Sequence, residues 1–227
     1  MATALLIRHG RTAANTSGEL AGQVGDVGLD DVGREQADAL AARLAGVPLT
    51  ALVCGPLRRC RETAQTIANP EGFSVDERLT ECDYGRWTGR SLKELARDRL
   101  WRVVQTHPSA VVFPGGESLR AVQTRAVDAI REHDAQAAAR AGPGAVWAAV
   151  SHGDVIKTIV ADALGLHLDL FQRITVAPGS VTIVEYTALR PFLVRLNDVG
   201  GDLSGLRSRR RGRRPSNAML GGGPGTP

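Results

Sequence analysis

The stretch LLIRHGRTAAN, residues 5–15, begins as an apolar run and becomes polar within one residue. Residues 5–7 are typical of a buried strand, and the run ends at Arg8, His9 and Gly10. A glycine at this point permits a tight turn and the close approach of a ligand. Two interpretations fit the tripeptide: a catalytic centre at the end of a buried strand, or a strand that meets an ordinary polar loop.

Outside this stretch the chain alternates short apolar runs with longer amphipathic segments. The sequence predicts strands over residues 4–10, 50–55, 144–153, 180–188 and 192–198, and helices over 34–46, 56–69, 91–104, 117–142 and 154–165. Asp30 or Asp31 is the expected N-cap of the first helix. Alternation of this kind predicts an α/β three-layer sandwich: a mainly parallel central sheet with helices on both faces, and a small cap between the second and third strands.

The positive charge lies at the C-terminal end of the chain. Six arginines fall between residues 207 and 214, no acidic residue follows Asp202, and without those six the net charge of +4 becomes −2. The sequence therefore predicts one domain over residues 1–204 and a disordered basic tail over 205–227. Such a tail could bind nucleic acid, but no aromatic residues are interleaved with its arginines, so a solvated tail is preferred.

Several other classes of protein are disfavoured. No apolar run is long enough for a signal peptide or a membrane span, so we expect a cytoplasmic protein with no membrane contact. The cysteines Cys54, Cys60 and Cys82 are odd in number and form no CxxC motif, which predicts reduced thiols rather than a zinc site or disulfides. Neither a GxxxxGK[ST] loop nor clustered aspartates for Mg²⁺ occurs.

A second strand end repeats the first. The run that ends in VSHG, residues 150–153, again places a histidine and a glycine, His152 and Gly153, where the apolar residues stop. Ligands of open α/β sheets bind at the carboxyl ends of the strands, so both histidines share one crevice if the two strands are neighbours. Gly153 also lies near the start of a predicted helix, whose free N–H groups favour an anion. One such histidine is a weak indication; two are a stronger one.

Arginines stand at the start of the second predicted helix, in GPLRRC. Arg58 and Arg59 lie in its first turn, where the helix dipole disfavours positive charge. An anionic ligand in the same space explains them, because the guanidinium fork matches phosphate oxygens, and Arg8 would face that ligand from the other side. The alternative is ion pairing at the surface with carboxylates such as Glu62.

The loop RLTECDYGRWTG, residues 78–89, carries two carboxylates, Glu81 and Asp83. A carboxylic acid beside a phosphate site can donate a proton to a departing alkoxide. The alternative for either residue is a helix cap or a surface charge.

In chain order the motifs LIRHGRTxxN, PLRRCxxTA, LxExxYGxWxG, PGGES and SHG resemble the histidine phosphatase (phosphoglycerate mutase-like) superfamily over about residues 4–198. The resemblance implies that His9 is the nucleophile that becomes phosphorylated and that Glu81 is the proton donor. Around the phosphoryl group it implies Arg8, Asn15, Arg59 and His152, with Arg58 as an outward neighbour. PGGES, residues 114–118, matches a turn that starts the long helix.

These residues predict a phosphomonoester hydrolase, a histidine (acid) phosphatase that acts through phospho-His9 on a small phosphorylated substrate without metal or cofactor. Arg8, Arg59 and a protonated His152 are expected to stabilise the transition state. The alternative is a phosphomutase of the phosphoglycerate mutase type, but the short stretch between Trp87 and PGGES favours the phosphatase branch. A non-catalytic phospholigand-binding module is less favoured because the implied nucleophile and donor are both present. A homo-oligomer is possible, and the physiological substrate is open.

Overall fold

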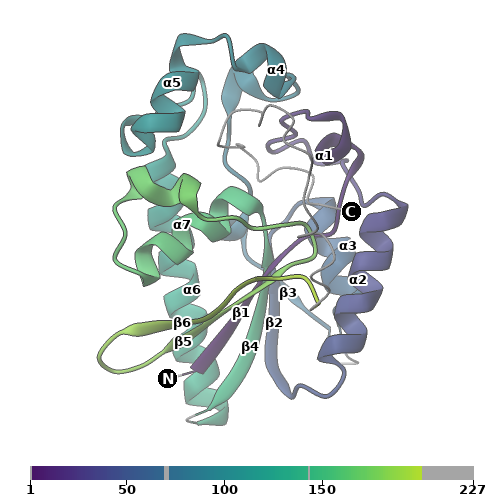
Figure 1. Cartoon of the computed structure of the whole chain (residues 1–227). Helices are drawn as coiled ribbons and strands as arrows, with labels where there is room; N and C mark the ends of the chain where they lie inside the picture. The colour runs from purple at the N-terminus through teal and green to yellow at the C-terminus, as the bar shows by residue number, and fades with distance from the viewer. Residues whose placement is uncertain (1, 69–71, 143, 201–227) are drawn as a thin grey trace, which may run out of the picture.

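A six-stranded sheet forms the centre of the computed structural model, which describes residues 2–68, 72–142 and 144–200 (Figure 1). The strands are β1 (Ala2–Arg8), β2 (Leu49–Cys54), β3 (Ser74–Val75), β4 (Ala145–Ser151), β5 (Val181–Tyr186) and β6 (Pro191–Asp198). Their order is β3-β2-β4-β1-β5-β6; the first four run parallel, and β5 is antiparallel to both of its neighbours. The predicted mainly parallel sheet is confirmed. Strand β3 was not predicted, because two residues are too few to show an alternating pattern.

Helices cover both faces of the sheet, with α2 and α3 on one face and α6 and α7 on the other (Figure 1). The α-helices are α1 (Ala13–Ser17), α2 (Asp31–Leu44), α3 (Arg58–Ile67), α4 (Leu92–Leu95), α5 (Arg99–Thr106), α6 (Leu119–Ala141) and α7 (Gly153–Ala163). Short 3-10 helices are η1 (Glu77–Leu79), η2 (Gly85–Trp87), η3 (Pro108–Ala110) and η4 (Leu168–Arg173). The three-layer sandwich predicted from the sequence is thus confirmed.

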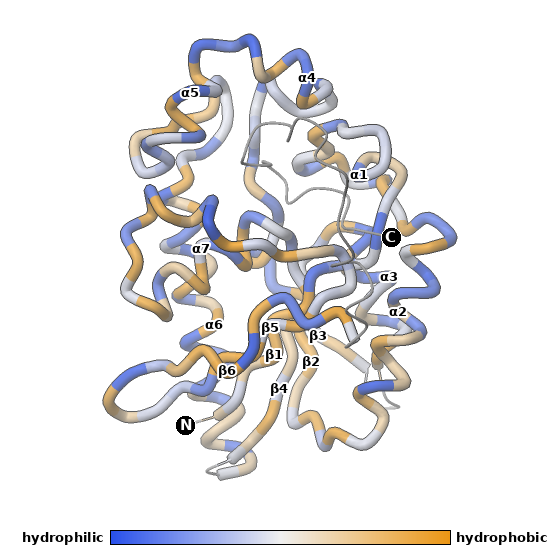
Figure 2. The backbone as a smooth tube through the Cα atoms, in the orientation of Figure 1, coloured by the Kyte–Doolittle hydropathy of each residue, from blue (hydrophilic) through white to orange (hydrophobic). Residues whose placement is uncertain are grey.

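Strand β1 shows why its sequence is apolar without a break. Ala4 and Leu6 pack into the cluster beneath α6 and α7, while Leu5 and Ile7 pack into the cluster beneath α2 and α3. All four are at most 5% exposed, and the central strands form an apolar band in Figure 2. Because both faces are buried, each of the large side chains contributes about 1.5–3 kcal/mol. The apolar run therefore ends only where the strand leaves the core.

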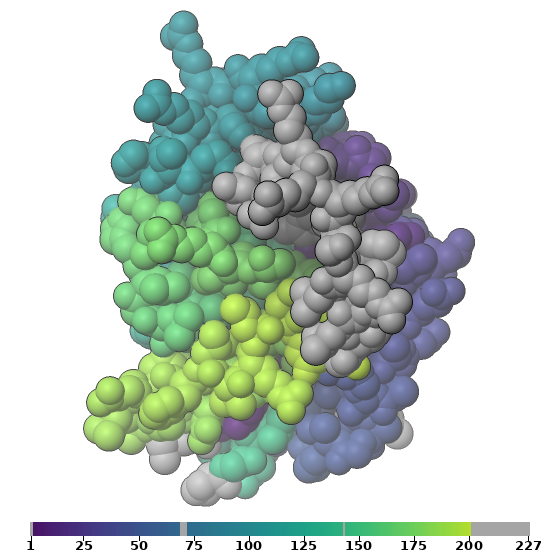
Figure 3. Space-filling model, viewed as in Figure 1, coloured from purple at the N-terminus to yellow at the C-terminus, as the bar shows by residue number. Residues whose placement is uncertain are grey.

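The cap between β3 and β4 contains two short helices, where the sequence predicted one over residues 91–104. Ser91 caps α4, with its Oγ accepting from the Glu94 N–H at 3.2 Å, and Asp98 caps α5 by accepting from the Leu100 N–H at 2.9 Å. A second capping residue within the predicted helix starts a new helix. The cap forms the teal end of the molecule in Figure 3.

Other predictions have different outcomes. Helix α1 was predicted as loop, and Pro56 precedes α3 instead of lying in its first turn. All three cysteines are buried free thiols, as predicted. Among the described residues no helix is both long enough and apolar enough to cross a membrane. The basic tail over 205–227 lies outside the described residues, and cytoplasmic location and homo-oligomerisation stay predictions.

The loop after β1 fits closely against the start of α2. Asp30 caps α2, accepting from the Gly33 N–H at 2.8 Å, and its other carboxylate oxygen accepts from Arg11 Nε at 2.8 Å. A methyl group on Gly33 would overlap the Arg11 carbonyl oxygen, and one on Gly10 would overlap the Gly33 carbonyl oxygen. Two glycines therefore let this loop and α2 touch backbone to backbone.

We expect Gly33→Ala to lower the free energy of unfolding by about 2–4 kcal/mol, because the backbone atoms that it would overlap cannot move aside cheaply. The matched control is Gly46→Ala, since no atom lies within 4 Å of a methyl group there. That control should change stability by less than about 0.5 kcal/mol. Denaturant unfolding measures both, and equal midpoints for the two variants would contradict this fit.

Candidate active site

His9 and His152 lie side by side at the ends of two neighbouring strands. Strands β1 and β4 pair in parallel with Arg8 opposite Ser151, and the His9 N–H donates to the Ser151 carbonyl at 3.0 Å. Both histidines follow this last paired position, so their ring centroids are 5.1 Å apart. The structure therefore brings together the two His-Gly pairs that the sequence singled out.

The His9 ring is held in one tautomer. Its Nδ1 lies 2.7 Å from the Gly10 carbonyl oxygen. A carbonyl oxygen only accepts, so Nδ1 carries the hydrogen and Nε2 keeps its lone pair. Burial, and then the charges of Arg59 and Arg8, lower the pKa of His9 well below its ordinary value. A neutral imidazole with a free Nε2 is the form that a nucleophile requires.

Two buried guanidiniums stand beside His9. Arg8 is fully buried and donates from Nη1 to the Val176 carbonyl at 2.8 Å, and burial lowers its pKa to about 10. Arg59, from the first turn of α3, is 2% exposed and donates from Nη2 to the Gly22 carbonyl at 2.7 Å. Positive charge removed from water in this way favours an anionic ligand.

Arg58 behaves differently from its neighbour. Its side chain is 54% exposed and pairs with Asp26 at 2.9 Å and with Glu62 at 2.7 Å. It is the outward neighbour that the resemblance implied, and its partner Glu62 is the carboxylate considered from the sequence.

Glu81 approaches the site from the loop after η1. Its side chain is buried, Oε1 accepts from the Cys82 N–H at 2.9 Å, and Oε2 lies 3.9 Å from His152 Nδ1. Burial raises the pKa of Glu81 to about 7, with a further upward contribution from Asp154 that Arg59 opposes. A carboxyl group that is still protonated near neutral pH can donate a proton. Asp83, the other candidate in this loop, accepts from the Gly85 N–H in a turn.

Arg125 of α6 holds the Glu81 loop by its backbone, and the sequence analysis missed it. Its guanidinium donates to the carbonyls of residues 78, 80 and 81 at 2.6–3.2 Å and pairs with Glu117 at 2.7 Å. Glu117 Oε1 in turn accepts from the Asp83 N–H. The sequence could have predicted the pair of Glu117 and Arg125, because Glu117 is the acidic residue of PGGES and Arg125 follows it by two helical turns.

The His152 ring is neutral in the site as the structure shows it, without a phosphoryl group. Burial, and then Arg59 and His9, lower the pKa of His152 well below its ordinary value, and the protonated ring expected in the transition state stays a prediction. Burial raises the pKa of the Cys60 thiol, whose Sγ lies 3.3 Å from His152 Nε2. The other ring nitrogen, Nδ1, lies on the side of Glu81, 3.9 Å from its Oε2.

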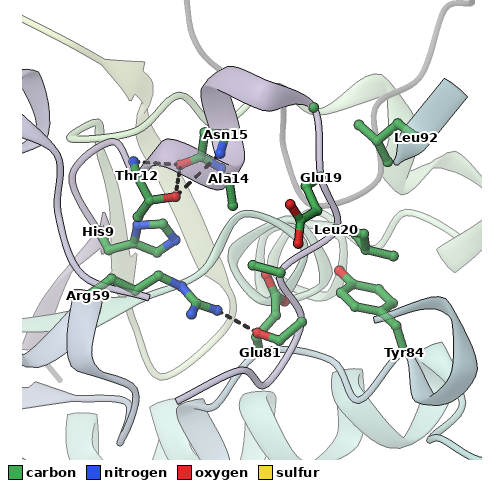
Figure 4. A pocket seen from close by; sticks show the side chains of 13 residues that line it. His9, Thr12, Ala14, Asn15, Glu19, Leu20, Arg59, Glu81, Tyr84 and Leu92 are labelled. Atoms are coloured by element: carbon green, nitrogen blue, oxygen red, sulfur yellow. Dashed lines mark hydrogen bonds between the residues drawn. The ribbon is translucent and has the colours of Figure 1, made fainter. Parts of the chain in front are cut away.

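A small pocket lies above these groups, and Figure 4 shows it. His9, Asn15, Arg59 and Glu81 line it directly, whereas Arg8, His152 and Gly153 are buried behind its wall. Asn15 Oδ1 accepts from the N–H and hydroxyl of Thr12 and so fixes the start of α1. Tyr84, which the sequence analysis did not single out, also lines the pocket and donates to Asp154 at 2.8 Å.

The pocket thus combines a neutral imidazole, one guanidinium and a carboxylic acid, and the second guanidinium, Arg8, is buried beside His9. Such a set can bind a phosphoryl group, attack it and protonate its leaving oxygen. Within residues 2–68, 72–142 and 144–200, no three His, Cys, Asp or Glu side chains are grouped so that they could hold a metal ion.

The family model of the histidine phosphatase superfamily (branch 1) matches residues 4–199. The chain belongs to this superfamily. The resemblance drawn from its motifs is therefore confirmed, and its relatives include proteins named as phosphatases and as phosphoglycerate mutases.

A glucosyl-3-phosphoglycerate phosphatase of Mycolicibacterium vanbaalenii is 33% identical over 73% of this chain and 75% of its own length. A probable phosphoglycerate mutase, GpmB of Cronobacter sakazakii, is 31% identical over 88% of this chain and 93% of its own. The solved structure of Bacillus stearothermophilus YhfR superposes with a TM-score of 0.79 at 28% identity, covering 88% of this chain and 98% of that one. The chain spans only 54% of several longer mycobacterial relatives.

We expect the His9 ring to stay neutral between pH 6 and 8, with its hydrogen on Nδ1, because burial and two guanidiniums oppose protonation. Nitrogen chemical shifts of labelled histidines followed against pH measure both properties. The signal that disappears in His9→Asn identifies the ring. A His9 ring that takes up a proton near pH 6.5 would contradict this arrangement.

Proposed function

We propose that this chain is a phosphomonoester hydrolase that works through a phosphohistidine at His9. One observation carries the proposal: a neutral imidazole with a free Nε2 shares a pocket with a carboxyl group whose pKa is about 7. A nucleophile and an acid that are both in their active forms at neutral pH match the two halves of phosphoryl transfer.

In the first half, His9 Nε2 attacks the phosphorus atom of the bound ester. The P–N bond forms as the bond between phosphorus and the ester oxygen breaks, and the Glu81 proton passes to the departing oxygen. Arg8 and Arg59 offset the negative charge spread over the equatorial oxygens. The Gly10 carbonyl stays hydrogen-bonded to Nδ1 and stabilises the positive charge that the ring acquires.

In the second half, water attacks the phosphorus atom of phospho-His9. Glu81, now a carboxylate, takes a proton from that water, the P–N bond breaks, and inorganic phosphate leaves. His9 returns to its neutral form and Glu81 to its protonated form. Arg8 and Arg59 offset negative charge in both halves of the reaction, so the proposed cycle needs no metal or cofactor. Because Glu81 must begin protonated, the pH optimum of activity is expected to be acidic to neutral.

The residues around the phosphoryl group have defined parts in this proposal. The His152 ring lies beside His9, and once a phosphate dianion is bound it can gain a proton and offset part of the negative charge. Asn15 offers its amide from the start of α1. Gly153, as the first residue of α7, contributes the positive end of that helix dipole.

A phosphomutase is the second candidate, because relatives carry both phosphatase and mutase names. A mutase must keep water away from the phosphohistidine while the substrate turns over. The cap here consists of the two short helices α4 and α5 with η3, which favours hydrolysis. Phosphate release compared with transfer between mono- and diphosphoglycerate separates the candidates, and transfer that is much faster than release would reverse the order.

We expect His9→Asn to lower hydrolysis of an aryl phosphate by about 10³-fold or more, because the bond to phosphorus can no longer form. His107→Asn is the control, since His107 is exposed on the cap. Rapid quenching of the wild-type reaction, in buffer containing EDTA, tests for the intermediate. The intermediate is detected as labelled phosphate that is bound to the protein and is released by acid. Full activity of His9→Asn would sink the mechanism.

The pH dependence tests Glu81. A raised carboxyl pKa keeps the donor protonated below about pH 7, so kcat/KM for an alkyl phosphate should fall as pH rises through 7. Glu81→Gln should lower that kcat/KM by 10²–10⁴-fold, flatten the profile, and affect aryl phosphates less because their leaving groups need less protonation. Glu77→Gln, at an exposed site in η1, is the control. An unchanged profile in Glu81→Gln would show that another group donates.

A further inference from the structure

The far side of the pocket, away from His9, is built by two segments that pair through their backbones. Gly18 ends α1 with φ of 69°, and residues 18–20 then run beside residues 89–92. The Leu92 N–H donates to the Gly18 carbonyl at 2.8 Å, and the Gly89 N–H donates to the Leu20 carbonyl at 2.8 Å. These bonds fix the position from which the side chain of Glu19 enters.

Figure 4 shows the Glu19 carboxylate pointing into the pocket, on the side opposite His9 and near Tyr84. Within the described part of the chain it has no hydrogen-bond or ion-pair partner. Leu20, Leu92 and Tyr84 also line the pocket, on the same side as Glu19 in Figure 4. A carboxylate left open at this place is available to a ligand.

The positive charge of the pocket is concentrated at the other end. Of the described lining residues, only Arg59 is a lysine or arginine, and its Nη2 and Nη1 donate to the carbonyls of Gly22 and Val24. The basic residues of the nearby cap are exposed and do not line the pocket: Arg90, Lys93, Arg97, Arg99 and Arg102. Among the described residues that line the pocket, the leaving group of a substrate therefore meets Glu19 without a lysine or arginine beside it to balance a negative charge of its own.

We propose that Glu19 selects phosphomonoesters whose alcohol part is uncharged or carries an ammonium group, and disfavours those that carry a carboxylate. This inference rests on the proposed hydrolase activity. A hydroxyl or ammonium group can donate to the Glu19 oxygens, whereas a carboxylate would lie beside a like charge. The selectivity would differ from that suggested by the relatives' names, since phosphoglycerate is itself a carboxylate.

Two pairs of substrates isolate the carboxylate. Glycerol 3-phosphate and 3-phosphoglycerate differ by a hydroxymethyl group in place of a carboxylate, and O-phosphoethanolamine and O-phosphoserine differ by a carboxylate alone. We expect wild-type kcat/KM to favour the partner without the carboxylate by about tenfold, which corresponds to about 1.4 kcal/mol. Glu19→Gln should reduce that preference to threefold or less, mainly through KM. Glu94→Gln, at an exposed position in α4, should leave it unchanged.

A binding measurement separates this inference from the proposed function. In the His9→Ala variant, calorimetry with the same four compounds reports the selectivity of the pocket without turnover. Tighter binding of the compounds without a carboxylate, lost on adding Glu19→Gln, supports the inference even if wild-type protein hydrolyses no ester. Equal or tighter binding of 3-phosphoglycerate and O-phosphoserine overturns it, whereas failure to hydrolyse an aryl phosphate overturns only the hydrolase.

Discussion

The parallel pairing of β1 with β4 is the constraint on which the site depends. With Arg8 opposite Ser151, the two strands leave the core at the same level, and the next residue on each is a histidine. The hydrogen bond from the His9 N–H to the Ser151 carbonyl extends this pairing by one residue. A shift of one position would send alternate side chains to the wrong face and separate the two rings. Burial on both faces of the sheet makes such a shift costly.

The same burial sets the chemistry of the site. Removal from water lowers the pKa values of His9 and His152 and raises that of Glu81 to about 7, so the site holds neutral rings and an acid that keeps its proton up to near neutral pH, beside two guanidiniums. In water at pH 7 the two imidazoles would be partly protonated and the carboxyl group would be almost fully ionised. Burial therefore changes the protonation of these groups in the direction that suits attack on a phosphate ester.

The elements and residues that depend on local sequence pattern could be predicted from the sequence. Unbroken apolar runs predicted the buried strands, and the His-Gly pairs at their ends located the site. It could not supply the charge of His152, which depends on burial and on cations distant in sequence. Glu19 gave no signal, because an exposed acid in a loop resembles any surface residue. Asp98, by contrast, was a visible capping residue within the helix predicted over 91–104, and it marked the break that the structure shows.

The contacts of Arg125 link the proposed proton donor, Glu81, to α6, a helix that does not line the pocket. Its guanidinium binds the carbonyls that precede and include Glu81, and α6 packs on β1 and β4, the strands that carry His9 and His152. The spacing between acid and nucleophile is therefore set by how one long helix sits on the sheet. A lysine, with a single ammonium group, could not replace the fork that binds several carbonyls at once. Transplanting this pocket to another scaffold would require α6 as well as the residues that line it.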